Sequence, residues 1–181
     1  MPEQAFVPAH AGIRIAALAP HARARIKSWL VDGPTLTVAG IQLPTTIGNT
    51  ASEAYRVLCL GPGDWLVTST TRPPAELLAE IANDLSNGFT ATDLSDALAT
   101  IQIEGPAARE LLSKGCGLDF HPSKFPAGQC ARTRFAQIPV VIDCVNPAPR
   151  FELHVARSYF AYLHSWLLDA AIEFESITAI A

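Results

Sequence analysis

The chain has 181 residues, of which 49% are apolar and 17% are charged, and its formal net charge is −4. The acidic balance argues against a nucleic-acid partner, because phosphate binding needs clustered lysine and arginine. The length suits one domain or two small units that share a core, and the low charge indicates that part of the surface meets another protein.

Targeting and membrane-spanning segments are not recognisable in this sequence. Residues 1–14 lack the charged segment and long apolar run of a secretory signal. The longest apolar runs fall far short of the ~20 residues that cross a bilayer. We therefore expect no membrane contact and a reducing, cytoplasmic setting, which suits the four cysteines as free thiols.

The first fifty residues predict extended structure and loop. Residues 12–18 alternate like a strand, with Ile13 and Ile15 on one face. Residues 21–31 fit either a strand or a helix. Residues 32–52 are rich in Gly, Pro and Thr and are expected to form a loop with one short extended piece.

A hairpin and a helix follow. Residues 55–60 and 65–69 predict two strands joined by the turn GPGD. Residues 73–88 predict a helix, because two prolines stand at its start and Asn87 and Gly88 supply a left-handed stop. The apolar stripe of this helix is Leu77, Leu78, Ile81 and Leu85.

The second half predicts strands around a short helix. Residues 89–95 and 98–105 look extended, and Ala99, Ile101 and Ile103 of the latter face one way. Residues 106–115 then predict a short helix, with Pro106 at its start and Gly115 at its end. Residues 129–143 predict two strands with a tight turn near Gln137.

The last segments are a strand and a helix. Phe151, Leu153 and Val155 are expected to point inward and Glu152 and His154 outward. Ser158 can cap the following helix. Its stripe is Phe160, Leu163, Leu167 and Ala170, with Tyr159, Tyr162 and Trp166 forming an adjacent stripe, so the helix can be buried on two sides.

Hairpins interspersed with helices indicate an α+β fold of mainly antiparallel sheet. We expect two small subdomains, residues 1–88 and 89–181, that together form one compact body. Phe160, Tyr162 and Trp166 are candidates for an exposed contact patch, and the alternative is that they pack into the protein's own core. The apolar excess also predicts a chain that dimerises or aggregates when it is isolated.

Metal binding is not expected. Structural zinc uses close pairs of ligands, but thirteen residues separate Cys116 from Cys130 and Cys130 from Cys144. Cys116 and His121 lie near one another in the chain without a second pair. We expect Cys59, Cys130 and Cys144 to lie in strands as small apolar residues.

Catalytic and cofactor-binding residues are not expected either. Cys116 follows the C-terminus of a predicted helix, which disfavours a thiolate, and nothing in the sequence orients His121 as its base. Asp93 and Asp96 are expected to brace a turn. The Gly-rich loops that bind nucleotides are absent, as is the nucleophile elbow of hydrolases.

The basic segments HARARIK (21–27) and ARTR (131–134) alternate with apolar residues. They predict solvated or subunit-facing strands and not a phosphate-binding patch.

One long stretch, residues 103–142, resembles the gamma subunit of heterotetrameric sarcosine oxidase. The matching residues are Gly105, Pro106, Ala108, Arg109, Leu111, Leu112, Lys114, Gly115, Cys116, Leu118, Asp119, His121, Pro122, Gly128, Cys130 and Ala131. The hairpin LGPGDWLV, the segment TDLSDALATIQIEGP and the closing FELHVARSYFAYLHSWLLDAA extend the likeness to about residues 43–174.

This resemblance implies a fold like that of the folate-binding aminomethyltransferases. It also implies that flavin, NAD and tetrahydrofolate are held by partner subunits, and that the gamma chain carries no catalytic residues. The resemblance further implies a complex that oxidises sarcosine to an imine at a flavin and yields glycine. In that family, electrons pass to oxygen, and the one-carbon unit passes to tetrahydrofolate or leaves as formaldehyde. The motif around Cys116 and His121 would then be a scaffold, with His121 holding the corner through a backbone hydrogen bond.

Two alternatives remain open at this point. The chain could be a stand-alone folate-binding protein of the aminomethyltransferase type, with Asp93 for the pterin and Arg109 for the tail. It could also belong to a related complex that dehydrogenates opines or other secondary amines.

Overall fold

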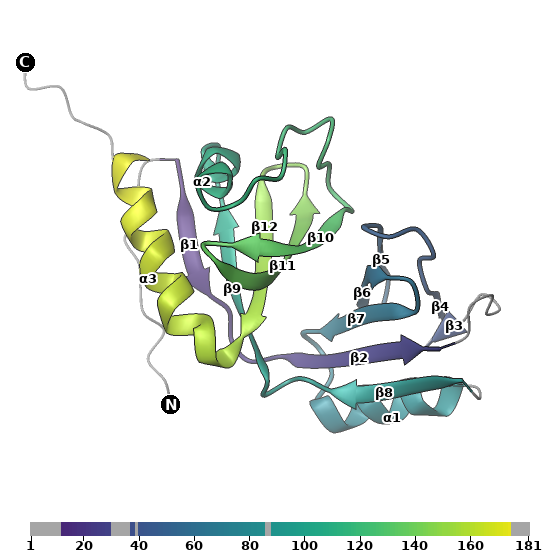
Figure 1. Ribbon diagram of the computed structural model, residues 1–181. Coiled ribbons are helices and arrows are strands. Elements are labelled where there is room, and N and C mark those ends of the chain that lie inside the picture. Colours follow the sequence, from purple (N-terminus) through teal and green to yellow (C-terminus); the bar gives the residue numbers. More distant parts are fainter. Residues whose placement is uncertain (1–11, 30–36, 39, 86–87, 175–181) are drawn as a thin grey trace, which may run out of the picture. The chain divides into compact units, whose positions relative to one another are not determined.

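The computed structural model describes residues 12–29, 37–38, 40–85 and 88–174, and the chain divides into two compact units. Each unit contains a five-stranded, mainly antiparallel sheet packed with at least one helix (Figure 1), in agreement with the predicted α+β class. The α1 unit, named after its helix, comprises residues 19–98 and 128–131. Of the described residues, the α2/α3 unit comprises 12–18, 99–127 and 132–174.

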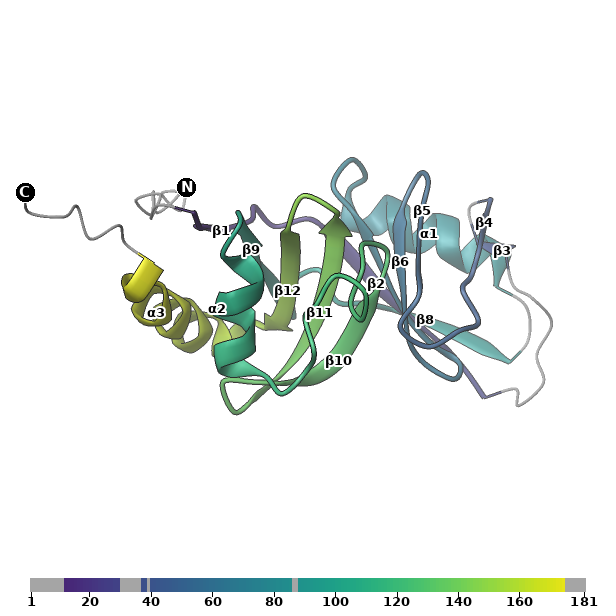
Figure 2. The ribbon, with the colours of Figure 1, turned by 90° about the horizontal axis from the view of Figure 1, so that it is seen from above.

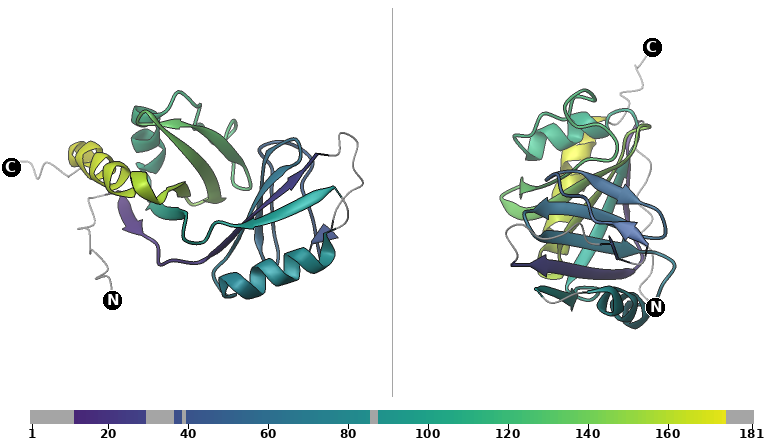
Figure 3. Two further views of the ribbon diagram at one scale, coloured as in Figure 1. Left: turned by 60° about the horizontal axis from the view of Figure 1, so that its bottom comes forward. Right: turned by 90° about the vertical axis from the view of Figure 1, so that its right-hand side faces the viewer.

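The sheet of the α1 unit has the strand order β5-β6-β7-β2-β8. Helix α1 (Pro74–Asp84) packs along β2 and β8 (Figure 3). The strands are β2 (Ala22–Ser28), β5 (Thr50–Ser52), β6 (Arg56–Gly61), β7 (Asp64–Ser69) and β8 (Phe89–Asp93), with a separate ribbon of β3 (Thr37–Val38) and β4 (Ile41–Gln42).

The predicted hairpin is confirmed as β6 and β7. Its turn needs Gly63, which has φ +62°, and a Cβ there would lie 2.5 Å from the carbonyl oxygen of Ser28. The helix is confirmed as α1, with Leu77 and Ile81 fully buried and Leu78 and Leu85 packed at the edge of the core. The helix ends at Asp84 because Leu85 is already extended, so the end lies before the predicted stop; Asn87 falls outside the described residues.

The sheet of the α2/α3 unit has the strand order β1-β9-β12-β11-β10. Helices α2 and α3 contact each other in this unit (Figure 2). The elements are β1 (Arg14–Ala17), β9 (Leu98–Glu104), α2 (Ala108–Gly115), β10 (Cys130–Phe135), β11 (Ile138–Asn146), β12 (Arg150–Ala156), the 3₁₀ turn η1 (Arg157–Tyr159), α3 (Phe160–Ala171) and the 3₁₀ turn η2 (Ile172–Phe174).

The two faces of this second sheet differ in polarity. Register places Ile15 beside Ile103 and Ile142 beside Leu153, and all four are buried on the apolar face. The opposite face carries polar side chains from the alternating positions, beginning with Arg14 beside Glu104. The sheet therefore contributes one side to the apolar core, and the other side carries polar residues, of which Thr100 and His154 are buried.

The border between the units differs from the division expected after Gly88. Strand β8 follows Gly88 but pairs with β2 over five residues, so it belongs to the α1 unit. Strand β1 was expected in the first subdomain, residues 1–88, but it pairs with β9. The start of the described chain therefore belongs to the α2/α3 unit. Both pairings are long-range, and local composition does not reveal them.

Several local predictions are corrected. Residues 22–28 form a strand, which resolves the ambiguity of that segment. Segment 32–52 contains three short strands where one extended piece was expected. Helix α2 begins at Ala108, so Pro106 precedes it and does not occupy its first turn.

His154 was predicted to point outward, on the face opposite Leu153 and Val155. It lies on the polar face of the sheet but is only 2% exposed, and its Nδ1 lies 2.9 Å from the Thr100 hydroxyl. Glu152, on the same face, is partly buried. Alternation identified the two faces correctly, but it does not tell whether a polar face is covered.

The last helix is buried on one side. Leu163, Leu167 and Ala171 are its buried residues, so Ala171 takes the place predicted for Ala170. Ser158 lies within η1 and does not cap α3, since no side-chain cap is present. Tyr159 and Tyr162 of the second stripe are 43% and 48% exposed.

Candidate functional site

The segment between α2 and β10, residues 116–129, forms a corner that Arg109 of α2 holds in place. The Arg109 guanidinium donates hydrogen bonds to the carbonyl oxygens of Phe120 and Phe125, the latter at 3.0 Å. It also lies 5.1 Å from the centroid of the Phe151 ring. Because the guanidinium presents several donors in a fixed plane, one side chain can join two separate points of the corner.

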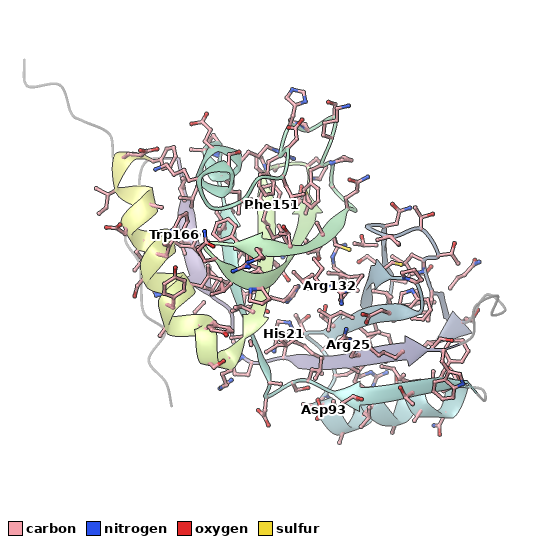
Figure 4. The ribbon with its side chains drawn as sticks, in the orientation of Figure 1. His21, Arg25, Asp93, Arg132, Phe151 and Trp166 are labelled. Atoms are coloured by element: carbon pink, nitrogen blue, oxygen red, sulfur yellow. The ribbon has the colours of Figure 1, made fainter. Side chains whose placement is uncertain are left out.

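Beneath Arg109, the three aromatic rings form a cluster. The Phe120 ring stands edge-on to Phe125 and to Phe151, with centroids 5.6 and 6.2 Å apart, and Phe125 stacks on Phe151 at 6.4 Å. All three are buried. Phe151 is contributed by β12 (Figure 4), so the corner is joined to the central part of its sheet.

His121 lies on the exposed side of the same corner. Its Nδ1 accepts the backbone N–H of Ser123 at 3.3 Å and lies 2.8 Å from the Ser123 hydroxyl. The backbone N–H of His121 donates to the Asp119 carboxylate at 2.9 Å, and the backbone carbonyl of His121 accepts from the N–H groups of Lys124 and Phe125. The predicted backbone hydrogen bond is confirmed, and these contacts give His121 a turn-forming role.

Cys116, which was considered above as a nucleophile with His121 as its base, follows the last residue of α2. Its sulfur lies 3.6 Å from the Thr133 hydroxyl of β10, while His121 contacts Ser123. The structure thus directs the two side chains to different partners. Cys59, Cys130 and Cys144 are buried in β6, β10 and β11, as expected, and all four cysteines are free thiols.

Position 115, the last residue of α2, requires glycine for a reason of packing and not of backbone conformation. A Cβ on this residue would lie 2.5 Å from the Phe135 ring. The Gly115 carbonyl accepts the N–H of Ala136, at 2.9 Å, from the turn after β10. Ala136 and Gln137 both have positive φ, 46° and 71°, which identifies the tight turn predicted near Gln137.

Helix α3 supports the same turn. The Tyr162 hydroxyl donates to the Ala136 carbonyl at 2.9 Å, and the Trp166 ring meets Phe135 edge-on with centroids 5.2 Å apart. Phe160 is half-buried and stacks on His164. Of the three residues suggested as a contact patch, only Tyr162 is well exposed, and both Tyr162 and Trp166 contact their own unit.

Asp93 braces a turn through its carboxylate. The Asp93 carboxylate accepts both the N–H and the hydroxyl of Ser95, at 2.9 and 2.6 Å, which closes a turn after β8 as expected. These hydrogen bonds lower the pKa of Asp93. Asp93 and Arg109, the candidates for holding folate, lie in different units.

The basic segment of β2 has a role that sequence patterning missed. Arg23 is only 1% exposed, and its guanidinium donates to the carbonyls of Ser95 and Leu98 at 3.3 and 3.1 Å. Arg25, labelled in Figure 4, forms a bidentate pair with Asp64 at 2.8 and 2.6 Å. The hydrogen bond to Asp64 raises the pKa of Arg25. These arginines stabilise the strands and do not form a solvated face.

Within the described ranges, no group of three or more His, Cys, Asp or Glu side chains is placed to hold a metal ion. No helix in the described part of the chain is long and apolar enough to span a membrane. The contacts of Arg109, His121, Cys116 and Asp93 all order local structure.

The comparison with family models decides the relationship: the sarcosine oxidase, gamma subunit family matches residues 34–173. The chain belongs to this family. The gamma subunit of Corynebacterium sp. (strain U-96) sarcosine oxidase is 31% identical over 140 residues, covering 76% of this chain and 67% of that protein. Its counterpart from Corynebacterium sp. (strain P-1) is 34% identical over 140 residues, covering 76% and 68%.

Solved structures place the fold in the same family. A chain of the heterotetrameric sarcosine oxidase from Corynebacterium sp. U-96, in complex with pyrrole 2-carboxylate, aligns with a TM-score of 0.84 at 27% identity, covering 94% of this gamma-family chain and 89% of that chain. The glycine cleavage system aminomethyltransferase T of Bartonella henselae aligns with a TM-score of 0.64 at 14% identity, over 88% of this chain and 46% of that one. The second match shows a shared fold and confirms the aminomethyltransferase-like architecture.

Proposed function

We propose that this protein is the non-catalytic gamma subunit of a heterotetrameric flavoenzyme that oxidatively demethylates sarcosine to glycine. The main support for this proposal is the structural alignment, over 94% of this chain, with a chain of a heterotetrameric sarcosine oxidase. Because the match covers 94% of this chain, the two chains share both units and not just one motif.

The reaction is assigned to the partner subunits. They hold the flavin, NAD and tetrahydrofolate; the methyl–nitrogen bond of sarcosine is oxidised to an imine at the flavin, and electrons pass to oxygen. The one-carbon unit passes to tetrahydrofolate or is released as formaldehyde. This chain supplies shape-complementary surface, in the cytoplasm.

The contacts of the motif residues support a structural role. Arg109 is committed to two carbonyls and an aromatic ring, and His121 is committed to Ser123. Neither side chain is arranged with a nucleophile, since Cys116 contacts Thr133. The family motif thus encodes a rigid corner between α2 and β10.

Co-expression tests the assembly. A tagged form of this chain, expressed with the neighbouring flavoprotein subunits of its own source, should purify as a stable yellow complex of fixed stoichiometry. The proposal is wrong if the other subunits assemble with one another and leave this chain separate.

A stand-alone folate-binding protein is the second candidate, favoured by the likeness to aminomethyltransferase T. The commitment of Arg109 to the corner removes the group suggested for the folate tail. Calorimetric titration of the isolated chain with tetrahydrofolate separates the two: saturable micromolar binding would favour this candidate, whereas we expect none.

A complex that dehydrogenates opines or other secondary amines is a variant of the first proposal. The substrate would be recognised by another subunit, so the assembled enzyme must be assayed. We expect sarcosine to be turned over faster than N-methyl amino acids with larger side chains.

Without its partners, this chain is expected to dimerise or aggregate.

A further inference from the structure

A row of polar residues crosses four strands at one end of the sheet in the α2/α3 unit. Arg14 of β1 pairs with Glu104 of β9, and Arg150 of β12 pairs with Asn146 of β11. The two pairs are adjacent because Gly105 donates its N–H to the Pro149 carbonyl at 3.0 Å. Across the neighbouring strands β1, β9, β12 and β11, the row therefore consists of the cation Arg14, the anion Glu104, the cation Arg150 and the amide Asn146.

The row lines an open hollow of about 800 Å³. Its walls also include the backbone crossing at Gly12 and Gly105 and the turn between β11 and β12. The crossing is close, since a Cβ on Gly105 would lie 2.3 Å from the Gly12 carbonyl oxygen. The lining residues are Gly12, Ile13, Arg14, Glu104, Gly105, Pro106, Asn146, Ala148, Pro149 and Arg150.

The hollow has more hydrogen-bond donors than acceptors. Both carboxylate oxygens of Glu104 are already engaged, one by Arg14 at 3.0 Å and the other by Gln102 at 2.9 Å. Arg150 reaches Glu152 through one nitrogen at 3.3 Å, and its Nε is buried without a hydrogen-bond partner. A buried donor of this kind costs free energy until an acceptor arrives.

The charge of the lining points to the nature of that acceptor. Two arginines and one glutamate give the hollow a formal charge of +1, whereas the whole chain carries −4. An arginine fork is suited to a carboxylate, to which it can donate two parallel hydrogen bonds. Local charge and donor surplus thus favour an acidic group.

The accessibility of the arginines favours a protein ligand over a small molecule. The side chains of Arg14 and Arg150 are 65% and 41% exposed, so the hollow is wide and shallow. A small-molecule site usually encloses most of its ligand. A protruding segment of another protein can fill a shallow hollow, while its flanking residues cover the rim.

We propose that this hollow receives an aspartate or glutamate side chain from a segment of the flavin-bearing neighbouring subunit, held by Arg150 and Arg14. This inference rests on the proposed function, because it requires the complex. The carboxylate accepts hydrogen bonds from the exposed guanidinium groups of Arg150 and Arg14, and Pro106 and Pro149 pack against the rest of the segment.

Charge reversal in the assembled enzyme provides the first test. The double variant Arg14→Glu, Arg150→Glu should weaken association with the flavin-bearing subunit by roughly tenfold or more, measured by biolayer interferometry, with most of the change in the dissociation rate. Arg157→Glu is the matched control, since Arg157 is exposed in the same unit outside the hollow, and it should bind as the parent does. Circular dichroism checks that each variant is folded.

Crosslinking provides a second test that needs no charge change. A photo-reactive phenylalanine analogue at Ala148, exposed in the turn that lines the hollow, should crosslink to the flavin-bearing subunit, next to an acidic residue of that chain. The same analogue at Ala54, an exposed alanine in the α1 unit that is not part of the hollow, serves as the comparison.

The outcomes separate the two levels of the account. If the parent chain forms the complex but the double variant binds equally well and Ala148 does not crosslink, the hollow is not the docking site, while the proposed function stands. If the parent chain fails to assemble, the proposed function fails and this inference fails with it. If assembly is unchanged but the isolated chain binds acetate or succinate through Arg150, the hollow is a small-molecule site and the proposal is overturned.

Discussion

The Arg109 guanidinium lies 5.1 Å from the centroid of the Phe151 ring while it holds the carbonyls of Phe120 and Phe125. This contact joins α2, the 116–129 corner and β12 through one side chain. It assigns a structural role to a residue that could otherwise be read as an anion-binding site.

Replacing Arg109 tests that role. Arg109→Met keeps much of the side-chain length but removes both hydrogen bonds, so the free energy of unfolding should fall by about 2 to 4 kcal/mol. Urea denaturation measures the change, and hydrogen exchange should become faster in residues 116–129. Arg157→Met, at an exposed site, should change stability by less than about 0.5 kcal/mol. Equal stability of the two variants would contradict the role assigned to Arg109.

Two nearby glycines provide a matched pair. Gly115→Ala would place a Cβ 2.5 Å from the Phe135 ring, so overpacking should cost about 1 to 3 kcal/mol. A Cβ at Gly117 meets nothing within 4 Å, and Gly117→Ala should be nearly neutral. Combining Gly115→Ala with Phe135→Leu should recover part of the loss, which a double-mutant cycle measures. Similar melting temperatures for the two single variants would contradict the packing argument.

His164 should make stability depend on pH. Burial lowers the pKa of His164 below 6.5, so the unfolded chain binds the proton more readily than the folded one. Stability is therefore retained above pH 6.5 and lost as the pH falls from 6.5 through the lower, folded-state pKa.

An NMR titration measures the His164 pKa directly. His164→Phe keeps a ring beside Phe160 and cannot titrate, so its stability should depend less on pH in this range. His21, whose pKa is lowered by burial and by Arg23, contributes in the same direction. A pKa at or above 6.5 for His164 would oppose this account.

The four thiols should differ in accessibility. Cys116 is half-buried, whereas Cys59, Cys130 and Cys144 are buried, and burial raises the pKa of Cys59. A thiol-specific reagent at neutral pH should modify Cys116 first, with the other three reacting at the rate of unfolding. Mass spectrometry of peptides identifies the order. Modification of Cys59 as rapidly as Cys116 would show that the burial is wrong.

The sequence predicted correctly those helices and strands that are determined by residues near to one another in the chain. The β6–β7 hairpin follows from its turn residues, and α1 follows from its prolines and the stripe of Leu77 and Ile81. The strands before and after Gln137 follow from two apolar runs and a short turn. In each case, neighbours in sequence decide the structure.

Long-range packing decided the features that sequence patterning missed. The burial of His154 depends on its neighbour Thr100 on another strand, and Gly115 is required by a ring twenty residues later in the chain, Phe135. Arg23 looked solvated because basic and apolar residues alternate, yet it binds carbonyls more than seventy residues away. These partners are brought together only by the completed sheets.

Reconstitution with the flavin-bearing partner subunits tests the central claim most directly. Peroxide and formaldehyde released from sarcosine should be undetectable with the purified chain alone, and should appear when the complete complex is assembled from separately purified subunits. Arg109→Lys and His121→Ala variants that assemble should retain the parent turnover number. Sarcosine turnover by this chain in the absence of every other subunit would contradict the account.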